Sequence, residues 1–308
     1  MSRAVVFDAY GGPEVLRVVE VPAPEPGPGQ IRVRVRAAGV NPIDAKVRGG
    51  RLDGRFPVAF PQTLGNEFAG VVDRLGAGVT GCRAGAEVFG FTSMAAYADH
   101  VLVGADQVAA KPADLPWVTA AALSAVGQTA YHALRILAVG RGETLLVHAA
   151  AGGVGTVAVQ LARRLGATVI GTASEGNHDY LRSLGATPVT YGAGLAERVR
   201  GLAPGGVDAV LDCVGAGAVR ASLDLVADRR RIGTTADETA AGSYGVHRVR
   251  YDRSADTLAE LARLHGAGDL VLPIARTFAL EAAPDAHRAI ETGHVRGKIV
   301  LLLTGGSG

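Results

Sequence analysis

The pattern of apolar and polar residues changes in character near residue 115. Before that point, short segments alternate apolar and polar side chains with a period of two, or carry brief apolar bursts, at 3–7, 31–37, 68–75, 86–91 and 97–103. Such segments predict strands, and the alternating ones have one face in the core and one in water. Gly-rich turns and a proline-rich loop at 22–30 separate them. We therefore expect a β-rich, barrel-like or sandwich-like first part.

After residue 115, Ala-rich helical patterns alternate with short apolar segments. The apolar segments lie at 144–150, 167–173, 186–191, 208–214 and 230–234, and the helical patterns at 118–137, 155–165, 179–184 and 216–226. This alternation predicts βαβ units and a doubly wound parallel sheet, so the fold class is α/β.

The end of the sequence returns to strand-like patterns. An apolar stretch at 270–280 and a helix at 281–293 precede a strand at 297–303, and we expect this tail to rejoin the first part. The predicted domains are 1–115 with 270–308, and 116–269 between them.

A glycine-rich turn joins the first apolar segment of the second domain to a helix. Ala150, Gly152 and Gly155 form an A-x-G-x-x-G version of the dinucleotide fingerprint, with Gly153 and Val154 between. The glycines allow close approach of the backbone to a pyrophosphate and of the helix to the strand, and the helix N-terminus favours phosphate. The alternative is a plain tight turn, but the strand before and the helix after favour dinucleotide binding.

The residues after the next strand indicate which dinucleotide. An NAD enzyme places Asp or Glu here, on the ribose 2′-hydroxyl. This chain has Ala173, followed by Ser174 and Asn177, which leave room for a 2′-phosphate and can donate hydrogen bonds to it. The sequence thus predicts NADPH, although Glu175 lies nearby and Ser174 and Asn177 are also helix-capping residue types.

Composition and charge restrict the other function classes. The 308 residues suffice for about two domains. The 31 basic and 29 acidic residues are scattered, so no nucleic-acid partner is expected. Cys82 and Cys213 are too few for a disulfide framework or a cysteine-rich metal site. No signal segment or membrane-length apolar run is seen, which predicts a cytoplasmic location without membrane association.

Several sequence blocks, in their order along the chain, resemble a known family. They are RAAGVNPIDAKVRGG at 36–50, LGNEFAGVV at 64–72, GQTAYHAL at 127–134, HAAAGGVGTVAVQLARRLGA at 148–167 and GHVRGKIVL at 293–301. Together they resemble the quinone oxidoreductase group of the medium-chain dehydrogenase/reductase superfamily. The resemblance implies a GroES-like catalytic domain with an inserted Rossmann domain, an active site in the cleft between them, and a homodimer.

The chain departs from the zinc-dependent members of that superfamily. Those enzymes have a cysteine in place of Asn41 and a histidine in place of Asn66, whereas Glu67 is retained here. A lone carboxylate does not make the three-ligand site of a catalytic zinc. The resemblance is therefore to the zinc-independent branch, and no metal is predicted.

The resemblance also implies roles for single residues. Asn41 would contact substrate or nicotinamide and Thr129 would hold the nicotinamide; the alternatives are a turn asparagine before Pro42 and a helix-interior threonine. Lys46, in the loop after Asn41, could donate a proton or hydrogen bond, or be solvated. Tyr191 would lie near the adenosine phosphate or be a sheet-end aromatic.

Further candidates lie where strands end. Val214 and Gly215, and Gly233 and Thr234, are at carboxyl ends of predicted parallel strands, where ligands bind in open sheets. Near the end of the chain, Arg296 and Lys298 either reach the cofactor or pair with carboxylates.

The sequence favours an NADPH-dependent, zinc-independent reductase of a quinone or an α,β-unsaturated carbonyl compound. Such acceptors take hydride without a Lewis acid because the charge delocalises. Two alternatives remain: an enoyl reductase of a biosynthetic pathway, and a non-catalytic NADPH-binding protein with a structural or regulatory role.

Overall fold

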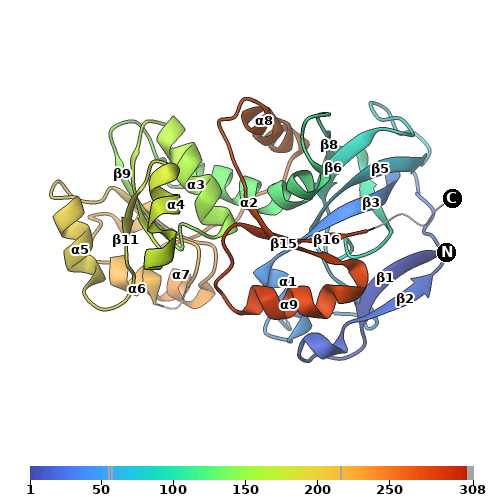
Figure 1. Cartoon of the computed structure of the whole chain (residues 1–308), viewed down its shortest axis with the longest axis horizontal. Coiled ribbons are helices and arrows are strands. Elements are labelled where there is room, and N and C mark those ends of the chain that lie inside the picture. The colour runs from blue at the N-terminus through green and yellow to red at the C-terminus, as the bar shows by residue number, and fades with distance from the viewer. Residues whose placement is uncertain (55, 57, 216, 304–308) are drawn as a thin grey trace. The chain divides into compact units, whose positions relative to one another are not determined.

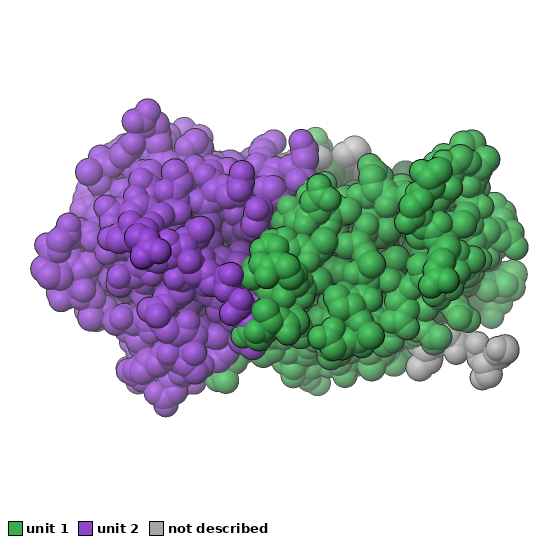
Figure 2. Space-filling view, turned by 90° about the horizontal axis from the view of Figure 1, so that it is seen from above, with its two compact units in different colours: residues 1–125, 253–268, 272–308 green, residues 126–252, 269–271 purple. Residues whose placement is uncertain are grey.

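The computed structural model describes residues 1–54, 56, 58–215 and 217–303. Residue contacts divide the chain into two compact units, coloured separately in Figure 2. Unit 1 comprises Met1–Ala125, Arg253–Gly268 and Leu272–Gly308, and unit 2 comprises Val126–Asp252 and Asp269–Val271. Residue 216, where a helix was predicted to begin, and residues 304–308, the end of the predicted first domain, lie outside the described residues.

Two β-sheets form the framework of unit 1 (Figure 1). In its described part, a three-stranded sheet has the order β2(Arg17–Val21), β1(Ser2–Phe7), β4(Gln62–Thr63). A seven-stranded sheet has the order β15(Ile274–Ala279), β16(Lys298–Leu302), β3(Gln30–Val40), β5(Glu67–Leu75), β6(Glu87–Phe91), β8(Val108–Ala110), and β7(His100–Gly104) also pairs with β3. β16 pairs with β3 in the antiparallel direction, so the tail of the chain joins the sheet of the first part, as expected from the sequence.

Alternation along β3 explains how this sheet builds its core. Ile31, Val33 and Val35 have exposed fractions of 0 to 1% and belong to one buried cluster, whereas the intervening Arg34 is partly exposed. From β16, Ile299 and Leu301 join the same cluster. The period-two pattern thus places the apolar side chains of the first half of β3 in one core cluster, whereas Arg32 between them is buried by its bonds to Asp73.

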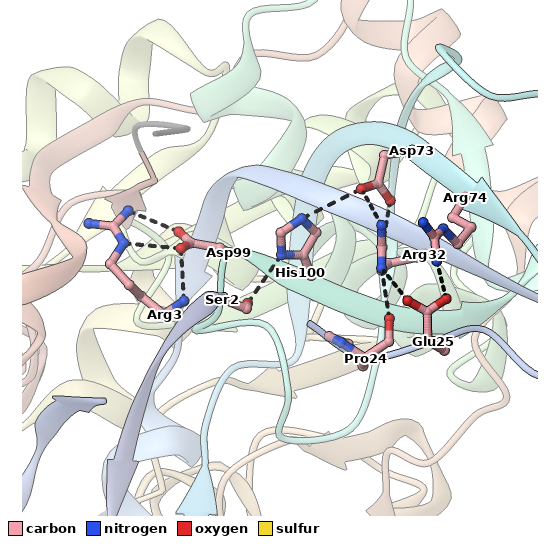
Figure 3. Close-up of polar contacts among 9 residues, drawn as sticks. All are labelled: Ser2, Arg3, Pro24, Glu25, Arg32, Asp73, Arg74, Asp99 and His100. Carbon is pink, nitrogen blue, oxygen red and sulfur yellow. Dashed lines mark hydrogen bonds and ion pairs between the residues drawn. The ribbon is translucent and has the colours of Figure 1, made fainter. Parts of the chain in front are cut away.

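A polar network ties β1 to the larger sheet (Figure 3). Arg3 donates from its backbone nitrogen and its Nε to Oδ2 of Asp99, at 2.9 and 3.0 Å. Beside this pair, the His100 ring contacts Ser2 Oγ at 3.1 Å and the Asp73 carboxylate at 3.5 Å. Arg32 in turn donates to both carboxylate oxygens of Asp73 at 2.9 Å. These bonds join four strand segments that lie far apart in the sequence.

The first half of α2(Trp117–Ile136) and several shorter helices complete the described part of unit 1. The shorter helices are η1(Pro13–Val15), α1(Pro42–Arg48), η2(Ala105–Gln107), α8(Ala255–Gly266), η5(Leu280–Ala282) and α9(Ala283–Glu291). The segment after Asn41 was predicted as a loop, and this was wrong: it is α1, with Pro42 in the first helical turn, where a missing N–H costs nothing. Helix α8 packs on β8 and so falls in unit 1, although the predicted 116–269 domain included it. Compact units need not coincide with domains, so the domain boundaries stay a prediction.

Unit 2 is built on one parallel sheet. In its described part six strands have the order β11(Thr187–Val189), β10(Thr168–Thr172), β9(Thr144–His148), β12(Ala209–Asp212), β13(Ile232–Thr234), β14(His247–Arg248). Its helices are the second half of α2(Trp117–Ile136), then α3(Gly153–Arg164), η3(Glu175–Asn177), α4(His178–Ser183), α5(Leu195–Leu202), α6(Ala218–Ser222), η4(Arg229–Arg231) and α7(Glu238–Tyr244). The predicted doubly wound parallel sheet is confirmed, and its order reverses between β9 and β12, the usual position of a ligand crevice.

Candidate active site

The predicted site residues fall into two groups, one in each unit. Asn41 and Lys46 belong to unit 1, whereas Thr129 and all the predicted cofactor residues belong to unit 2. In unit 2 most of these residues follow the carboxyl ends of β9, β10, β12 and β13, at one edge of the parallel sheet.

Hydrogen bonds to Thr172 fix the backbone of the turn after β9. Ala149 has a φ of 52°, in the left-handed region, and its backbone nitrogen donates to Thr172 Oγ1 at 3.1 Å. The next nitrogen, of Ala150, donates to the Thr172 carbonyl at 3.0 Å. Gly152 is the N-cap of α3 and has no side chain to cap the helix. The first N–H groups of α3 are therefore left for a ligand or water.

Gly155 fixes how closely α3 approaches the strand. A Cβ atom at this position would lie 2.4 Å from the Ala149 carbonyl oxygen and 2.6 Å from Ala150 Cα, both of them backbone atoms. At Gly152 a Cβ would approach only that oxygen, at 3.3 Å. Gly152, Gly153 and Val154 are partly exposed, whereas Gly155 is buried. The turn thus fits a pyrophosphate approaching from residues 152–154, with Gly155 as the packing contact.

The end of β10 carries no carboxylate at the position that selects NAD. Ala173 is 5% exposed, and its nitrogen donates to the Val189 carbonyl at 3.1 Å. Ser174 is exposed and precedes η3, and Asn177 Nδ2 donates to Ser174 Oγ at 3.1 Å. The two predicted 2′-phosphate donors therefore lie together. Ser174 and Asn177 occupy the N-cap positions of η3 and α4, but neither side chain makes a capping hydrogen bond.

Asp212 shapes the loops after β12 and β13, and sequence reasoning missed it. Its carboxylate is fully buried and accepts from the backbone nitrogens of Val214 and Gly215 at 2.9 Å. It also accepts from Thr234 Oγ1 at 2.6 Å. Val214 is about half exposed, and Thr234 and Gly233 are buried. Thr234 therefore positions the loop through Asp212, and Val214 is the predicted residue here that is open to a ligand.

Thr129 lies in the second half of α2 and contacts a residue that the sequence did not single out. Its Oγ1 lies 2.7 Å from the hydroxyl oxygen of Tyr251, and the Tyr251 ring stacks on His132 with centroids 4.6 Å apart. Tyr251 follows β14, at the same strand-end edge as the other residues of the group. Tyr191 lies two residues beyond β11 and is 55% exposed, so it follows the strand rather than ending it.

In unit 1, Asn41 belongs to a buried polar cluster. Its Nδ2 donates to Glu67 Oε1 at 2.8 Å, and Oε2 of Glu67 accepts from the backbone nitrogen of Ala125 at 2.6 Å. Lys298 Nζ donates to Asn41 Oδ1 at 2.6 Å, Glu67 Oε1 at 2.7 Å and the Val40 carbonyl at 3.1 Å. Of the two alternatives for Lys298, the structure shows the pairing with a carboxylate. Arg296 is exposed.

Asp44 accepts three further hydrogen bonds within this cluster. Its Oδ2 accepts from the Asn41 backbone nitrogen at 2.8 Å and from the Tyr97 hydroxyl at 2.9 Å, and its Oδ1 accepts from Asn66 Nδ2 at 2.9 Å. Burial raises the pKa of Asp44 from 3.8 to about 6, because the bonds from the Asn41 nitrogen and the Tyr97 hydroxyl and the charge of Lys298 offset only part of the desolvation. Lys46, two residues further along α1, is half-buried, and its predicted donor role remains a proposal.

The cluster does not suit a zinc ion. Positions 41, 66 and 67 do lie together, since Asn41 bonds Glu67 and both asparagines bond Asp44. Zinc takes thiolate, imidazole or carboxylate ligands, whereas two of these positions carry amides. The third, Glu67, already bonds an ammonium group at 2.7 Å. The side chains present form a buried, hydrogen-bonded ion pair instead of a metal site.

The raised pKa of Asp44 gives a testable dependence of stability on pH. Between about pH 4 and 6 the folded protein keeps a proton on Asp44 that the unfolded chain has released, so stability falls as the pH rises through this range. Asp44→Asn removes this dependence. As the pH rises from about 4 to 6, the free energy of unfolding of the variant should therefore increase by ~3 kcal/mol relative to that of the wild type. Urea unfolding over this range measures it, with exposed Asp106→Asn as the control. A constant difference would show that Asp44 does not titrate here.

Comparison with known proteins adds independent information. Residues 27–113 match the family model of an alcohol dehydrogenase GroES-like domain, and residues 184–301 match that of a zinc-binding dehydrogenase. The chain is 34% identical to the quinone oxidoreductase of Pseudomonas aeruginosa, over 98% of this chain and 100% of that protein. It is 38% identical to the spectinabilin polyketide synthase system protein NorB of Streptomyces orinoci, over 80% of this chain. The chain spans 12% of that protein's length, and 8% and 6% of two further synthases that it matches.

Among solved structures, the fold is similar to that of the Escherichia coli quinone oxidoreductase complexed with NADPH. The TM-score is 0.88 at 29% identity, covering 98% of this chain and 100% of that one. Within the described ranges, no helix has both the length and the apolar character needed to cross a membrane.

Proposed function

This chain belongs to the zinc-independent quinone oxidoreductase group of the medium-chain dehydrogenase/reductase superfamily, and from that premise we propose that it reduces quinones or α,β-unsaturated carbonyl compounds with NADPH. The observation that carries the proposal is the cluster of unit 1. Amides stand at two positions where zinc-dependent members have zinc ligands, and a buried ammonium bonds one of these amides and Glu67. A site without a Lewis acid suits acceptors that delocalise the incoming charge themselves.

We assign the residues of unit 2 to the cofactor. The N–H groups at Gly153, Val154 and Gly155 would hold the pyrophosphate. Ala150 and Gly152, whose own nitrogens donate to the Thr172 and Ala149 carbonyls, would shape the turn around it. Ser174 and Asn177 would hold the 2′-phosphate. NADPH supplies the hydride when bound. Val214 and Thr129 would hold the nicotinamide half, with Gly233 and Thr234 shaping the adjacent loop and Tyr191 near the adenosine phosphate.

We assign the substrate to the residues of unit 1. Asn41 would donate to the carbonyl oxygen of the acceptor and so stabilise the negative charge that develops there. Lys46 would be the proton or hydrogen-bond donor on the same helix. The protein's own contribution is to orient the acceptor and to exclude water.

One observation favours the enoyl reductase alternative. The similarity to polyketide synthases extends over 80% of this chain, so acceptors of the biosynthetic kind, thioesters with a conjugated C=C bond, belong in the test panel. The non-catalytic alternative predicts NADPH binding without turnover of any acceptor.

The first experiment titrates NADPH and NADH by fluorescence and then adds acceptors to the same sample. We expect tighter binding of NADPH, and its oxidation by 1,4-benzoquinone, cyclohex-2-enone or crotonyl-pantetheine after subtraction of the rate without enzyme. The rank of kcat/KM among the three separates quinone, enone and enoyl thioester reduction. Binding without any turnover would instead support the non-catalytic alternative.

Introducing a carboxylate after β10 should reverse the cofactor preference. In Ala173→Asp the new side chain would repel a 2′-phosphate and could accept from a ribose 2′-hydroxyl. We expect the ratio of kcat/KM for NADPH over NADH to fall about tenfold to hundredfold. Ala173→Ser is the control for volume, and its ratio should stay near that of the wild type. An unchanged ratio in Ala173→Asp would place the 2′-phosphate elsewhere.

Two predictions concern the whole protein. We propose that it is a homodimer in the cytoplasm, with a small-molecule acceptor and no nucleic-acid or membrane partner. Light scattering on the purified protein measures the oligomeric state, and a monomer would contradict that part of the proposal.

A further inference from the structure

The orientation of the Asn41 side-chain amide is fixed by chemistry. An ammonium group can donate hydrogen bonds but cannot accept them, so the amide atom 2.6 Å from Lys298 Nζ must be Oδ1. Nδ2 then faces Glu67 Oε1, a carboxylate oxygen that can only accept. The opposite orientation would set an N–H group against an ammonium and an oxygen against a carboxylate. Lys298 and Glu67 therefore act together on the rotation of this one amide.

Lys298 has no donor left for a ligand. Its three N–H bonds are matched by three acceptors, namely Asn41 Oδ1, Glu67 Oε1 and the Val40 carbonyl. Glu67 is likewise occupied, since Oε1 accepts from Lys298 and Asn41 while Oε2 accepts from Ala125. Lys298 is 3% exposed and Glu67 is fully buried. Neither side chain is placed to contact a substrate directly.

One donor of this arrangement remains. Nδ2 of Asn41 carries two hydrogens, and no described residue accepts the second. The Asn41 side chain also lies between a cation on its oxygen and an anion on its first N–H. The ammonium and the carboxylate polarise the amide in opposite senses, so what the pair fixes is the direction in which the remaining N–H points.

We propose that Lys298 and Glu67 are positioning residues that lock the Asn41 carboxamide so that its second Nδ2 hydrogen binds the carbonyl oxygen of the acceptor. This inference rests on the proposed function and deepens it: the site selects acceptors that carry a carbonyl oxygen next to the reducible bond.

The kinetic test removes both charges at once. A single substitution would leave one buried charge unpaired and endanger folding, whereas Glu67→Gln/Lys298→Gln keeps polar groups of similar size. For the double variant we expect kcat for cyclohex-2-enone to fall about tenfold to hundredfold with little change in the Kd for NADPH. The matched control is Lys111→Gln, another buried lysine, which bonds the Pro112 and Leu115 carbonyls and Glu87. It should lose stability but keep kcat.

A spectroscopic test separates positioning from a merely structural role. The chain has three asparagines, Asn41, Asn66 and Asn177, so asparagine-selective 15N labelling gives three side-chain amides, assigned by Asn41→Asp. With NADP⁺ bound and no hydride available, cyclohex-2-enone should shift one of the two Asn41 amide protons in the wild type. In the double variant both Asn41 protons should move toward the values of a free amide, and the shift caused by the enone should be lost.

The outcomes are distinct. If the double variant folds and keeps the wild-type kcat, or if saturating enone moves neither Asn41 proton, the inference is overturned while the reductase function stands. If none of the three acceptors supports oxidation of NADPH by the wild type, the proposed function fails, and the inference about substrate binding fails with it.

Discussion

Replacing Asn41 by alanine is expected to lower kcat for a carbonyl acceptor about a hundredfold to a thousandfold, the usual cost of losing one donor to a developing oxyanion. The variant deletes both amide hydrogens and leaves Lys298 Nζ and Glu67 Oε1 bonded to each other at 2.7 Å. Because the residues that we propose for the pyrophosphate and the 2′-phosphate lie in unit 2, the Kd for NADPH should stay near the wild-type value. Steady-state kinetics and a fluorescence titration measure the two quantities.

A second amide in unit 1 provides the control for Asn41→Ala. Gln107 lies in η2, where its Oε1 accepts from the Gly104 nitrogen at 2.8 Å, outside the cluster around Glu67. Gln107→Ala should retain kcat even if its melting temperature falls. Equal losses of kcat in both variants would mean that Asn41 acts through the fold alone.

Replacing Gly155 by alanine should damage both cofactor binding and stability. The added Cβ would lie 2.4 Å from the Ala149 carbonyl oxygen, a backbone atom held by the turn after β9, so α3 must move away from the strand. Overpacking of this kind costs about 1 to 3 kcal/mol in the free energy of unfolding. The first N–H groups of α3 move with the helix, and losing one hydrogen bond to a phosphate raises the Kd for NADPH about tenfold or more.

The control for Gly155→Ala is a helical glycine with open space around it. At Gly201 in α5 a Cβ would meet no atom within 4 Å. Gly201→Ala should therefore leave NADPH binding unchanged and stabilise the protein by up to ~1 kcal/mol, since alanine favours helix more than glycine does. If Gly155→Ala bound NADPH as tightly as Gly201→Ala, the turn after β9 would not be the pyrophosphate site.

Elements whose signal is local were predicted well from the sequence. The apolar segments at 144–150 and 208–214 became β9 and β12, because strands buried on both faces are continuous apolar runs. Helix α1 was missed because Asn41 followed by Pro42 is equally typical of a turn. The difference depends on Asp44, whose carboxylate accepts from the Asn41 nitrogen and so caps the helix. The dipeptide Asn41-Pro42 alone therefore does not distinguish a turn from the start of a helix.

The candidate site was predictable only where its residues are neighbours in the sequence. The glycine turn and the strand-end residues follow from a local motif. Lys298 and Glu67 are separated by 231 positions, and no periodicity links them, so pairing with an unspecified carboxylate was as far as the sequence could go. Tyr251 carried no motif at all, because its contact with Thr129 depends on the path of the chain after β14.

The position of β16 has a consequence for how the protein is made. This strand lies inside its sheet, between β15 and β3, yet it is synthesised long after β3 has left the ribosome. Unit 2 is almost continuous in sequence and can fold while the chain is still growing, whereas the sheet of unit 1 stays open along β3 until residues 298–302 arrive. Over the same interval the Glu67 carboxylate has no Lys298 ammonium to pair with. A nascent chain halted before residue 298 should therefore hold a folded parallel sheet in unit 2 and an incomplete seven-stranded sheet in unit 1, whose open edge along β3 is a binding site for chaperones.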